Sequence, residues 1–283
     1  MTDDSDAKRE TAASFGAAAD QYRSSDGHRS GADLDRLAEW CADATIALDV
    51  ATGAGHTAGA LVDAGVSTVL ATDASPTMVR TAVDEFPGVE GAVADAERLP
   101  FGANAFDAIA CRIAAHHFPN PEAFVAEVAR VSRPGATFAF EDTVAPVRSG
   151  DDAARPGPDC GDPELGADSS APDLDRTDLA EFIDRIERLR DPTHVRSHPT
   201  AQWTAWLRDH GFEIETVEHF TKRLPFDDWT AAQSLAPERR VRVERLLLEA
   251  PSEAKSVFEI EIEDGAVRSF ANHKALIRAT RSA

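Results

Sequence analysis

Short apolar runs alternate with helix-like segments between residues 45 and 145. The apolar runs are IALDV (46–50), STVLAT (67–72), VEGAVA (89–94), FDAIACRI (106–113) and ATFAFEDT (136–143). Between them lie helix-like stretches such as HTAGALVDA, PTMVRTAVDEF and PEAFVAEVARVS. Parallel strands need long crossover connections, which are usually helices. The alternation therefore predicts an α/β fold with a doubly wound, mostly parallel sheet.

The rest of the chain surrounds this core. With 283 residues, we expect one domain. A helical cap is predicted over 1–44, the core over 45–147 and a helical lid with C-terminal strands over 173–283. Residues 148–172 are rich in Gly, Pro, Asp and Ser and lack periodicity, which predicts a flexible acidic insertion.

Helices and strands are also predicted inside the last region. Helices are expected over about 173–189, 200–210 and 227–250, and a strand over 212–220. FEIEIEDGAVRSF (258–270) resembles a hairpin that turns at Asp264-Gly265, and KALIRAT (274–280) a final strand. In the core, Ser75-Pro76 and Asn120-Pro121 each predict a helix start, because Ser or Asn caps a helix and Pro suits its first turn.

Composition limits the partners and the compartment. Formal net charge is −21, and the only lysines are Lys8, Lys222, Lys255 and Lys274. Such acidity favours adaptation to high salt and argues against a nucleic-acid partner. The three cysteines form no CxxC pair, the N-terminus does not resemble a signal peptide, and no apolar run approaches the ~20 residues of a membrane span. We expect a cytoplasmic protein without a membrane span.

A glycine-rich turn follows the first strand. Gly53, Gly55 and Ala58 satisfy the loose dinucleotide pattern GxGxxG/A, and Asp73 ends the second strand, where an acid can accept hydrogen bonds from ribose hydroxyls. These residues alone are compatible with a nicotinamide-dependent oxidoreductase. They are also compatible with a tight turn that binds no ligand.

Acidic residues at three strand ends distinguish between nucleotides. Asp49 lies just before the glycines, Asp73 ends the second strand and Asp95 follows the third. A pyrophosphate is repelled by a nearby carboxylate, whereas an ammonium group is attracted. Acids at these positions suit a ligand with an ammonium group, a ribose and an adenine, and S-adenosylmethionine is such a ligand.

The same segments resemble a known family. LDVATGAG, TDASPTMVRTA and ADAERLPFGANAFDAIACRIAAHHFPNPEAFVAEVARVSRPGATF resemble the class I S-adenosylmethionine-dependent methyltransferases, especially the small-molecule branch that includes ubiquinone and menaquinone C-methyltransferases. The resemblance is strong over roughly residues 45–145 and weaker outside them. It implies a Rossmann-like, doubly wound seven-stranded sheet with an antiparallel last strand, an N-terminal helical cap and a helical insertion after strand five.

The resemblance also assigns cofactor-binding residues. It implies that the methionine part of the cofactor lies near Asp49, Gly53, Gly55 and Arg112, and the ribose near Asp73 and Ala74. The adenine is expected at Asp95 and Ala96, and Tyr22 is expected to close the pocket, although simple packing explains this tyrosine equally well. The family turn often begins with glycine, where this chain has Ala51.

Methyl transfer from a sulfonium is an in-line displacement that mainly requires orientation and exclusion of water. A base is needed only if the acceptor must lose a proton. His116 and His117, which follow the fourth strand, are the candidates, although adjacent histidines can also serve only in packing and loop capping. Arg190, Asp191, His194 and Arg196 form a polar cluster that either contacts the acceptor or caps a helix.

No metal site is predicted, because His116 and His117 are adjacent and lack the i, i+4 spacing of a helical metal pair. The expected activity is methyl transfer to a small-molecule acceptor. A nicotinamide-dependent oxidoreductase and a non-catalytic S-adenosylmethionine-binding sensor are the alternatives. The sequence leaves open the acceptor and the choice between a monomer and a homodimer.

Overall fold

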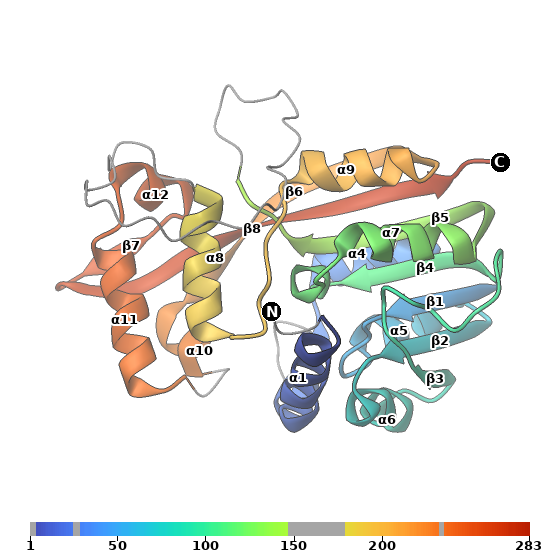
Figure 1. Ribbon diagram of the computed structural model, residues 1–283, viewed down its shortest axis with the longest axis horizontal. Coiled ribbons are helices and arrows are strands. Elements are labelled where there is room, and N and C mark those ends of the chain that lie inside the picture. Colours follow the sequence, from blue (N-terminus) through green and yellow to red (C-terminus); the bar gives the residue numbers. More distant parts are fainter. Residues whose placement is uncertain (1–3, 25–28, 147–178, 232–234) are drawn as a thin grey trace.

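The protein is built on one mixed β-sheet in the order β3-β2-β1-β4-β5-β8-β6, with the short β7 paired to β8 (Figure 1). The computed structural model describes residues 4–24, 29–146, 179–231 and 235–283, so the predicted acidic insertion 148–172 lies outside the described residues. The strands are β1 (Ile46–Val50), β2 (Thr68–Asp73), β3 (Val89–Val93), β4 (Phe106–Arg112), β5 (Ser132–Thr143), β6 (Phe212–Pro225), β7 (Glu261–Glu263) and β8 (Ala266–Arg281).

Helices precede, connect and follow these strands. They are α1 (Asp4–Ala17), α2 (Ala19–Ser24), α4 (Ala32–Cys41), α5 (His56–Asp63), α6 (Pro76–Glu85), α7 (Pro121–Val131), α8 (Leu179–Arg190), α9 (Thr200–Asp209), α10 (Phe226–Ala231), α11 (Pro237–Leu248) and α12 (Ser252–Val257). A 3₁₀ turn, η1 (Ala115–His117), follows β4. The helices predicted at 1–44, 200–210 and 227–250 are thus present, the last divided into α10 and α11.

The first five strands are parallel and lie between two helical layers; β1 and β4 are almost wholly buried, whereas the edge strand β3 is largely exposed. Side chains of β1 alternate between the layers: Leu48 and Val50 pack with α7 and α9, and Ala47 packs with α4 and α5. Both faces of these strands are therefore apolar, as expected for a parallel sheet covered on both sides. The doubly wound fold predicted from the alternation is confirmed.

Strand β8 inserts antiparallel between β5 and β6. The seven-stranded sheet with an antiparallel last strand is thereby confirmed, and β7 adds an eighth, three-residue strand. The predicted turn at Asp264-Gly265 is present, with positive φ at both residues. The division into a hairpin strand and a separate final strand is wrong, because β8 runs unbroken from Ala266 to Arg281.

The reason for this length is the pairing of β8 with β6, which runs from Phe212↔Arg281 to Pro225↔Ser269. Both strands extend beyond the parallel strands and carry a third hydrophobic cluster with α8, α10, α11 and α12. Figure 1 shows these helices grouped at one end of the molecule, away from β1, β2 and β3. The predicted strand 212–220 therefore continues to Pro225.

Both predicted helix caps are present. The Ser75 hydroxyl accepts a hydrogen bond from the Met78 backbone N–H, 3.4 Å away, at the start of α6. The Asn120 side-chain oxygen accepts one from the Ala123 N–H, 3.1 Å away, at the start of α7. Each cap satisfies an N–H group that has no partner inside its helix.

Candidate functional site

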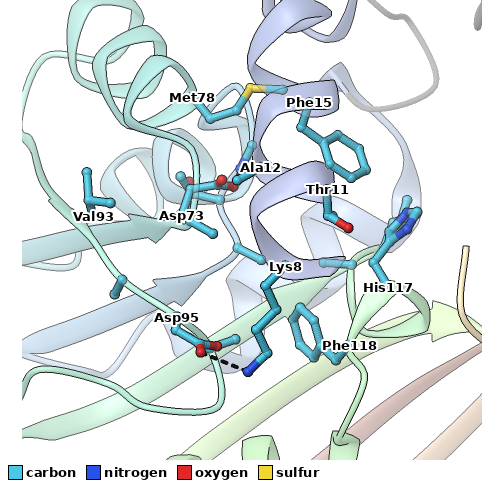
Figure 2. Close-up of a pocket in the computed structure, with 18 of the residues that line it drawn as sticks. Lys8, Thr11, Ala12, Phe15, Asp73, Met78, Val93, Asp95, His117 and Phe118 are labelled. Atoms are coloured by element: carbon cyan, nitrogen blue, oxygen red, sulfur yellow. Dashed lines mark hydrogen bonds and ion pairs between the residues drawn. The ribbon is translucent and has the colours of Figure 1, made fainter. Parts of the chain in front are cut away.

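A cavity of about 380 Å³ lies at the carboxyl ends of the parallel strands. Residues that follow β1, β2, β3 and β4 form its floor, and α1 covers it (Figure 2). Ligands of doubly wound sheets bind at this edge, where crossovers on opposite sides leave a crevice. The fold thus brings the turns after four strands to one place.

The glycine turn after β1 has two functions. Gly53 lines the cavity with φ +55°, and a Cβ there would meet nothing within 4 Å. Gly55 does not line the cavity; its Cβ would lie 2.7 Å from Ala82 in α6, so it permits close packing of α5 on α6. Ala51 also has positive φ, +56°, where glycine is the easier residue.

Asp73 connects the second strand to the turn. Its carboxylate accepts hydrogen bonds from the backbone N–H groups of Gly53 at 3.0 Å and Ser75 at 2.8 Å. Burial raises the pKa of Asp73, although these two donors oppose the shift. Asp73 and Ala74, which are expected near the ribose, both line the cavity.

Asp95 and Ala96 also line the cavity, at the end reached by α1. Lys8 of α1 pairs with Asp95 at 2.8 Å and with Glu97 at 2.5 Å (Figure 2). Burial lowers the pKa of Lys8, but hydrogen bonds to the two carboxylates outweigh it and raise the pKa overall. Sequence reasoning missed Lys8, whose only signal was that lysine is rare in this chain.

Asp49 lies behind the turn and does not line the cavity. Its carboxylate is buried and accepts a hydrogen bond from the Thr52 hydroxyl at 2.6 Å. Burial raises the pKa of Asp49 to about 7, and the nearby Asp73 adds to the shift. Thr52 lies between Asp49 and the cavity, which it lines.

Arg112, the last residue of β4, lines the cavity and takes part in a chain of ion pairs. Its Nε lies 2.8 Å from Glu141, and the guanidinium also binds Asp33 of α4. Glu141 is fully buried and takes a second partner, Lys274 of β8, at 3.0 Å. The next residue, Ile113, has φ +53°, an uncommon conformation for a β-branched residue that places strain at the cavity wall.

Tyr22 lines the cavity, and its backbone oxygen lies 3.2 Å from Nε2 of His56. Phe15 of α1 contacts both Tyr22 and His117, with ring centroids 5.4 and 4.8 Å apart. Phe15, Met78 and Phe118 make much of the lining apolar (Figure 2). None of these three residues was assigned a role from the sequence.

The two histidines of η1 have different surroundings. His117 lines the cavity, whereas His116 does not. His116 binds Asp142 through its Nδ1, 2.5 Å away, and through its backbone N–H at 2.8 Å. Burial lowers the pKa of His116, but the Asp142 carboxylate outweighs it and raises the pKa overall.

The residues of the predicted polar cluster at the end of α8 and just after it have different partners in the structure. Thr193 contacts His117 through its carbonyl and hydroxyl oxygens, and Asp191 accepts a hydrogen bond from the Thr193 hydroxyl. The backbone N–H groups of Val195 and Arg196 donate to the His116 carbonyl oxygen. His194 binds the buried Asp184 at 2.8 Å. Arg190 instead packs over Trp229, 4.9 Å from its ring centroid, away from the cavity.

In the described ranges of the chain, no group of three or more His, Cys, Asp or Glu side chains is arranged to hold a metal ion. Among the same residues, no helix is long and apolar enough to cross a membrane.

Comparison with known proteins agrees with this architecture. Residues 48–140 match the family model described as a methyltransferase domain. The uncharacterized methyltransferase YcgJ of Bacillus subtilis is 30% identical over 276 residues, covering 94% of this chain and 97% of that protein. The crystal structure of YcgJ superimposes with a TM-score of 0.73 at 28% identity, over 88% of this chain and 98% of that one.

A shorter similarity extends to a methyltransferase whose name specifies its substrate. The demethylmenaquinone methyltransferase of Renibacterium salmoninarum is 35% identical over 88 residues, covering 31% of this chain and 37% of that protein. Together with the full-length similarity to YcgJ and the sheet order, these matches define the family. The chain belongs to the class I S-adenosylmethionine-dependent methyltransferases.

Proposed function

We propose that this protein binds S-adenosylmethionine in the cavity beneath α1 and transfers its methyl group to a small molecule. The observation that carries the proposal is the charge of the lining. The acids Asp73, Asp95 and Glu97 line the cavity, while each of its lysine and arginine side chains is already paired with a carboxylate, namely Lys8, Arg9 and Arg112. A pyrophosphate needs free positive charge or free N–H groups, whereas an adenosine with a cationic amino acid suits acidic acceptors.

The residues fit the parts of this cofactor. Two backbone donors leave acceptor positions free on the Asp73 carboxylate, since each carboxylate oxygen can accept about two hydrogen bonds. These free positions suit two ribose hydroxyls. Asp95 and Ala96 would hold the adenine beside the apolar Val93 and Phe118.

The methionine part would lie near Gly53 and Arg112. The field of the buried Asp49 would favour its ammonium group from behind Thr52. Gly55 contributes through packing of α5 rather than through contact. Tyr22 and Phe15 would close the cavity over the sulfonium and exclude water.

The acceptor would approach from the side of His117 and Phe15, where α1 meets η1. The enzyme's main task is then orientation, because the sulfonium is already an activated methyl donor. The similarity to a demethylmenaquinone methyltransferase supports a small-molecule acceptor here. The acidic charge argues against a nucleic-acid acceptor. We propose a cytoplasmic protein that acts as a monomer or a homodimer.

Two alternatives make different predictions for binding. A nicotinamide-dependent oxidoreductase binds NAD(H) and not S-adenosylhomocysteine, the product form of the cofactor. A sensor binds the cofactor but catalyses no transfer. Isothermal titration calorimetry with S-adenosylhomocysteine and NAD⁺ distinguishes the proposed methyltransferase from the oxidoreductase. We expect binding of S-adenosylhomocysteine alone. Binding of NAD⁺ alone would refute the proposal.

A further inference from the structure

The His117 ring stands at the boundary between the cavity and the segment after α8. On one side of the ring lies the cavity, where Phe15 packs edge-on against His117 with the two ring centroids 4.8 Å apart (Figure 2). On the other side, Nδ1 lies 3.0 Å from the Thr193 carbonyl oxygen and 3.2 Å from the Thr193 hydroxyl oxygen. In the described part of the chain, Nε2 of His117 has no hydrogen-bond partner.

The direction of these hydrogen bonds follows from Asp191. The Thr193 hydroxyl donates to the Asp191 carboxylate at 2.6 Å, and the Thr193 backbone N–H donates to the same carboxylate oxygen at 2.9 Å. A hydroxyl has a single proton, so toward His117 its oxygen can only accept. The carbonyl oxygen of Thr193 is also an acceptor only. His117 must therefore carry its proton on Nδ1, which leaves Nε2 as a free acceptor.

Burial keeps the His117 ring neutral, although the Asp191 carboxylate opposes this effect. The groups that face His117 are His116 beside it in η1, Asp191 and His194 from the segment after α8, and Phe15 of α1. Burial and the neighbouring His116 lower the pKa of His117 to about 3. A neutral ring avoids repulsion of a sulfonium in the cavity and can accept a proton.

We propose that Asp191 and Thr193 are positioning residues that hold His117 with Nε2 unprotonated toward the cavity, so that His117 takes a proton from an acceptor that bears an O–H or N–H group. The proposal rests on the proposed function, because the methyl donor is S-adenosylmethionine. It narrows the acceptors to hydroxyl compounds, phenols, enols and N–H amines. Tertiary amines and thioethers, which have no proton to lose, are excluded.

The chemical step balances without another reactant. A lone pair of the acceptor oxygen or nitrogen forms the new bond to the methyl carbon, and the carbon–sulfur bond breaks with its pair going to sulfur. The acceptor proton moves to Nε2 of His117, and the resulting imidazolium later releases it to water. Because the attacked atom becomes strongly acidic as its bond to carbon forms, a weak base is sufficient.

The tautomer can be measured directly by ¹⁵N NMR of the full-length protein, labelled on histidine and saturated with S-adenosylhomocysteine. The resonances of His117 are assigned by their loss in His117→Gln. At pH 7 we expect a protonated Nδ1 and an unprotonated Nε2. A His117 ring protonated on Nε2, or on both nitrogens, would overturn the proposal.

Three variants test the role of Asp191 and Thr193. Thr193→Val and Asp191→Asn should each reduce the excess of the Nδ1-protonated tautomer without abolishing it, because the Thr193 carbonyl oxygen remains an acceptor 3.0 Å from Nδ1. Thr193→Ser should restore the wild-type spectrum. Asp209→Asn, an exposed change of the same type in α9, should leave the spectrum unchanged. If Thr193→Val and Asp191→Asn both keep the wild-type ratio of tautomers, the positioning role is wrong.

The acceptor class is tested by product charge. The protein is incubated with a small-molecule cell extract and S-adenosylmethionine labelled on its methyl group, and the products are passed over a cation exchanger at alkaline pH. We expect label in products without permanent charge, reduced about 10- to 100-fold by Thr193→Val. Label in quaternary ammonium or sulfonium products would overturn the acceptor class. Failure of the proposed function is recognised separately, as absence of S-adenosylhomocysteine binding in calorimetry.

Discussion

The carboxyl groups of Asp73 and Asp49 lie on opposite sides of the glycine turn and have different relations to the cavity. Asp73 lines it and holds the turn through the Gly53 N–H. Asp49 is buried behind Thr52 and acts on the cavity only through its electric field. Substitution of Asp73, which lines the cavity, should therefore have a different effect from substitution of Asp49, which acts on the cavity only through its charge.

Replacement of Asp73 by Ala should weaken binding of S-adenosylhomocysteine about 10- to 100-fold, because hydrogen bonds to a charged acceptor contribute about 1.5–3 kcal/mol. Asp73→Asn, which keeps one side-chain oxygen, should lose less. The exposed Asp63→Ala in α5 is the matched control. Calorimetry gives the affinities, and an unchanged affinity of Asp73→Ala would show that the ribose lies elsewhere.

Asp49 should make the stability depend on pH. Its pKa is about 7 in the folded protein and near 3.8 when unfolded, so the folded state retains a proton that the unfolded state has lost. Stability from this residue is therefore lost as the pH rises from about 4 to about 7, by at most about 4 kcal/mol.

Denaturant unfolding of wild type and Asp49→Asn across this pH range measures the effect. We expect the stability of the wild type, relative to the variant, to fall as the pH rises. A constant difference between the two proteins would contradict a raised pKa for Asp49.

At the scale of elements, α1 forms the cover of the cavity. Lys8 ties it to the segment after β3 through Asp95 and Glu97, and Phe15 ties it to η1 through His117. The ion pairs are partly buried, so they hold the helix more firmly than fully exposed pairs would. A cofactor that reaches Asp95 must share this carboxylate with Lys8 or displace it.

Removal of the Lys8 charge should accelerate cofactor exchange. In Lys8→Met, α1 loses its charged attachment, so both association and dissociation of S-adenosylhomocysteine should be faster. Lys255→Met in α12, far from the cavity, is the control. Stopped-flow fluorescence measures both rates, and unchanged rates would show that α1 does not move for the ligand.

Local signals in the sequence were sufficient to predict most strands, the capped helix starts and the positions of the acids at strand ends. Ser75 and Asn120 act within three residues, so their roles can be recognised from their neighbours alone. The contact between His117 and Thr193 joins residues 76 positions apart, and Arg112 and Asp33 are 79 apart. Such contacts depend on how elements dock, and for this reason neither was predicted.

The roles of the two motif glycines and the length of β8 also depend on how elements dock, so the sequence predicted them only in part. Gly53 and Gly55 belong to one motif, but only the docking of α6 distinguishes a cavity residue from a packing residue. The region of β8 was predicted as a hairpin over 258–270 and a separate strand over 274–280, with Asn272 and His273 between them. In the fold, the Asn272 side chain donates a hydrogen bond to Glu187 of α8, and this partner allows a polar residue to be buried within the strand.

At the scale of the whole molecule, the main feature is the net charge of −21. Like charges on a folded surface repel each other, and salt screens the repulsion over about 3 Å at 1 M compared with about 10 Å at 0.1 M. The melting temperature should therefore rise when KCl is increased from about 0.1 M to about 2 M. Differential scanning calorimetry measures it, and a melting temperature that stays constant or falls would argue against salt adaptation.

The central claim is transfer of a methyl group from S-adenosylmethionine to a small molecule. Incubation of the purified protein with methyl-labelled S-adenosylmethionine and a small-molecule cell extract tests it most directly. We expect label in a low-molecular-weight product, dependent on the protein and reduced in Asp73→Ala. No labelled product in any fraction, despite binding of the cofactor, would contradict the claim and favour a sensor.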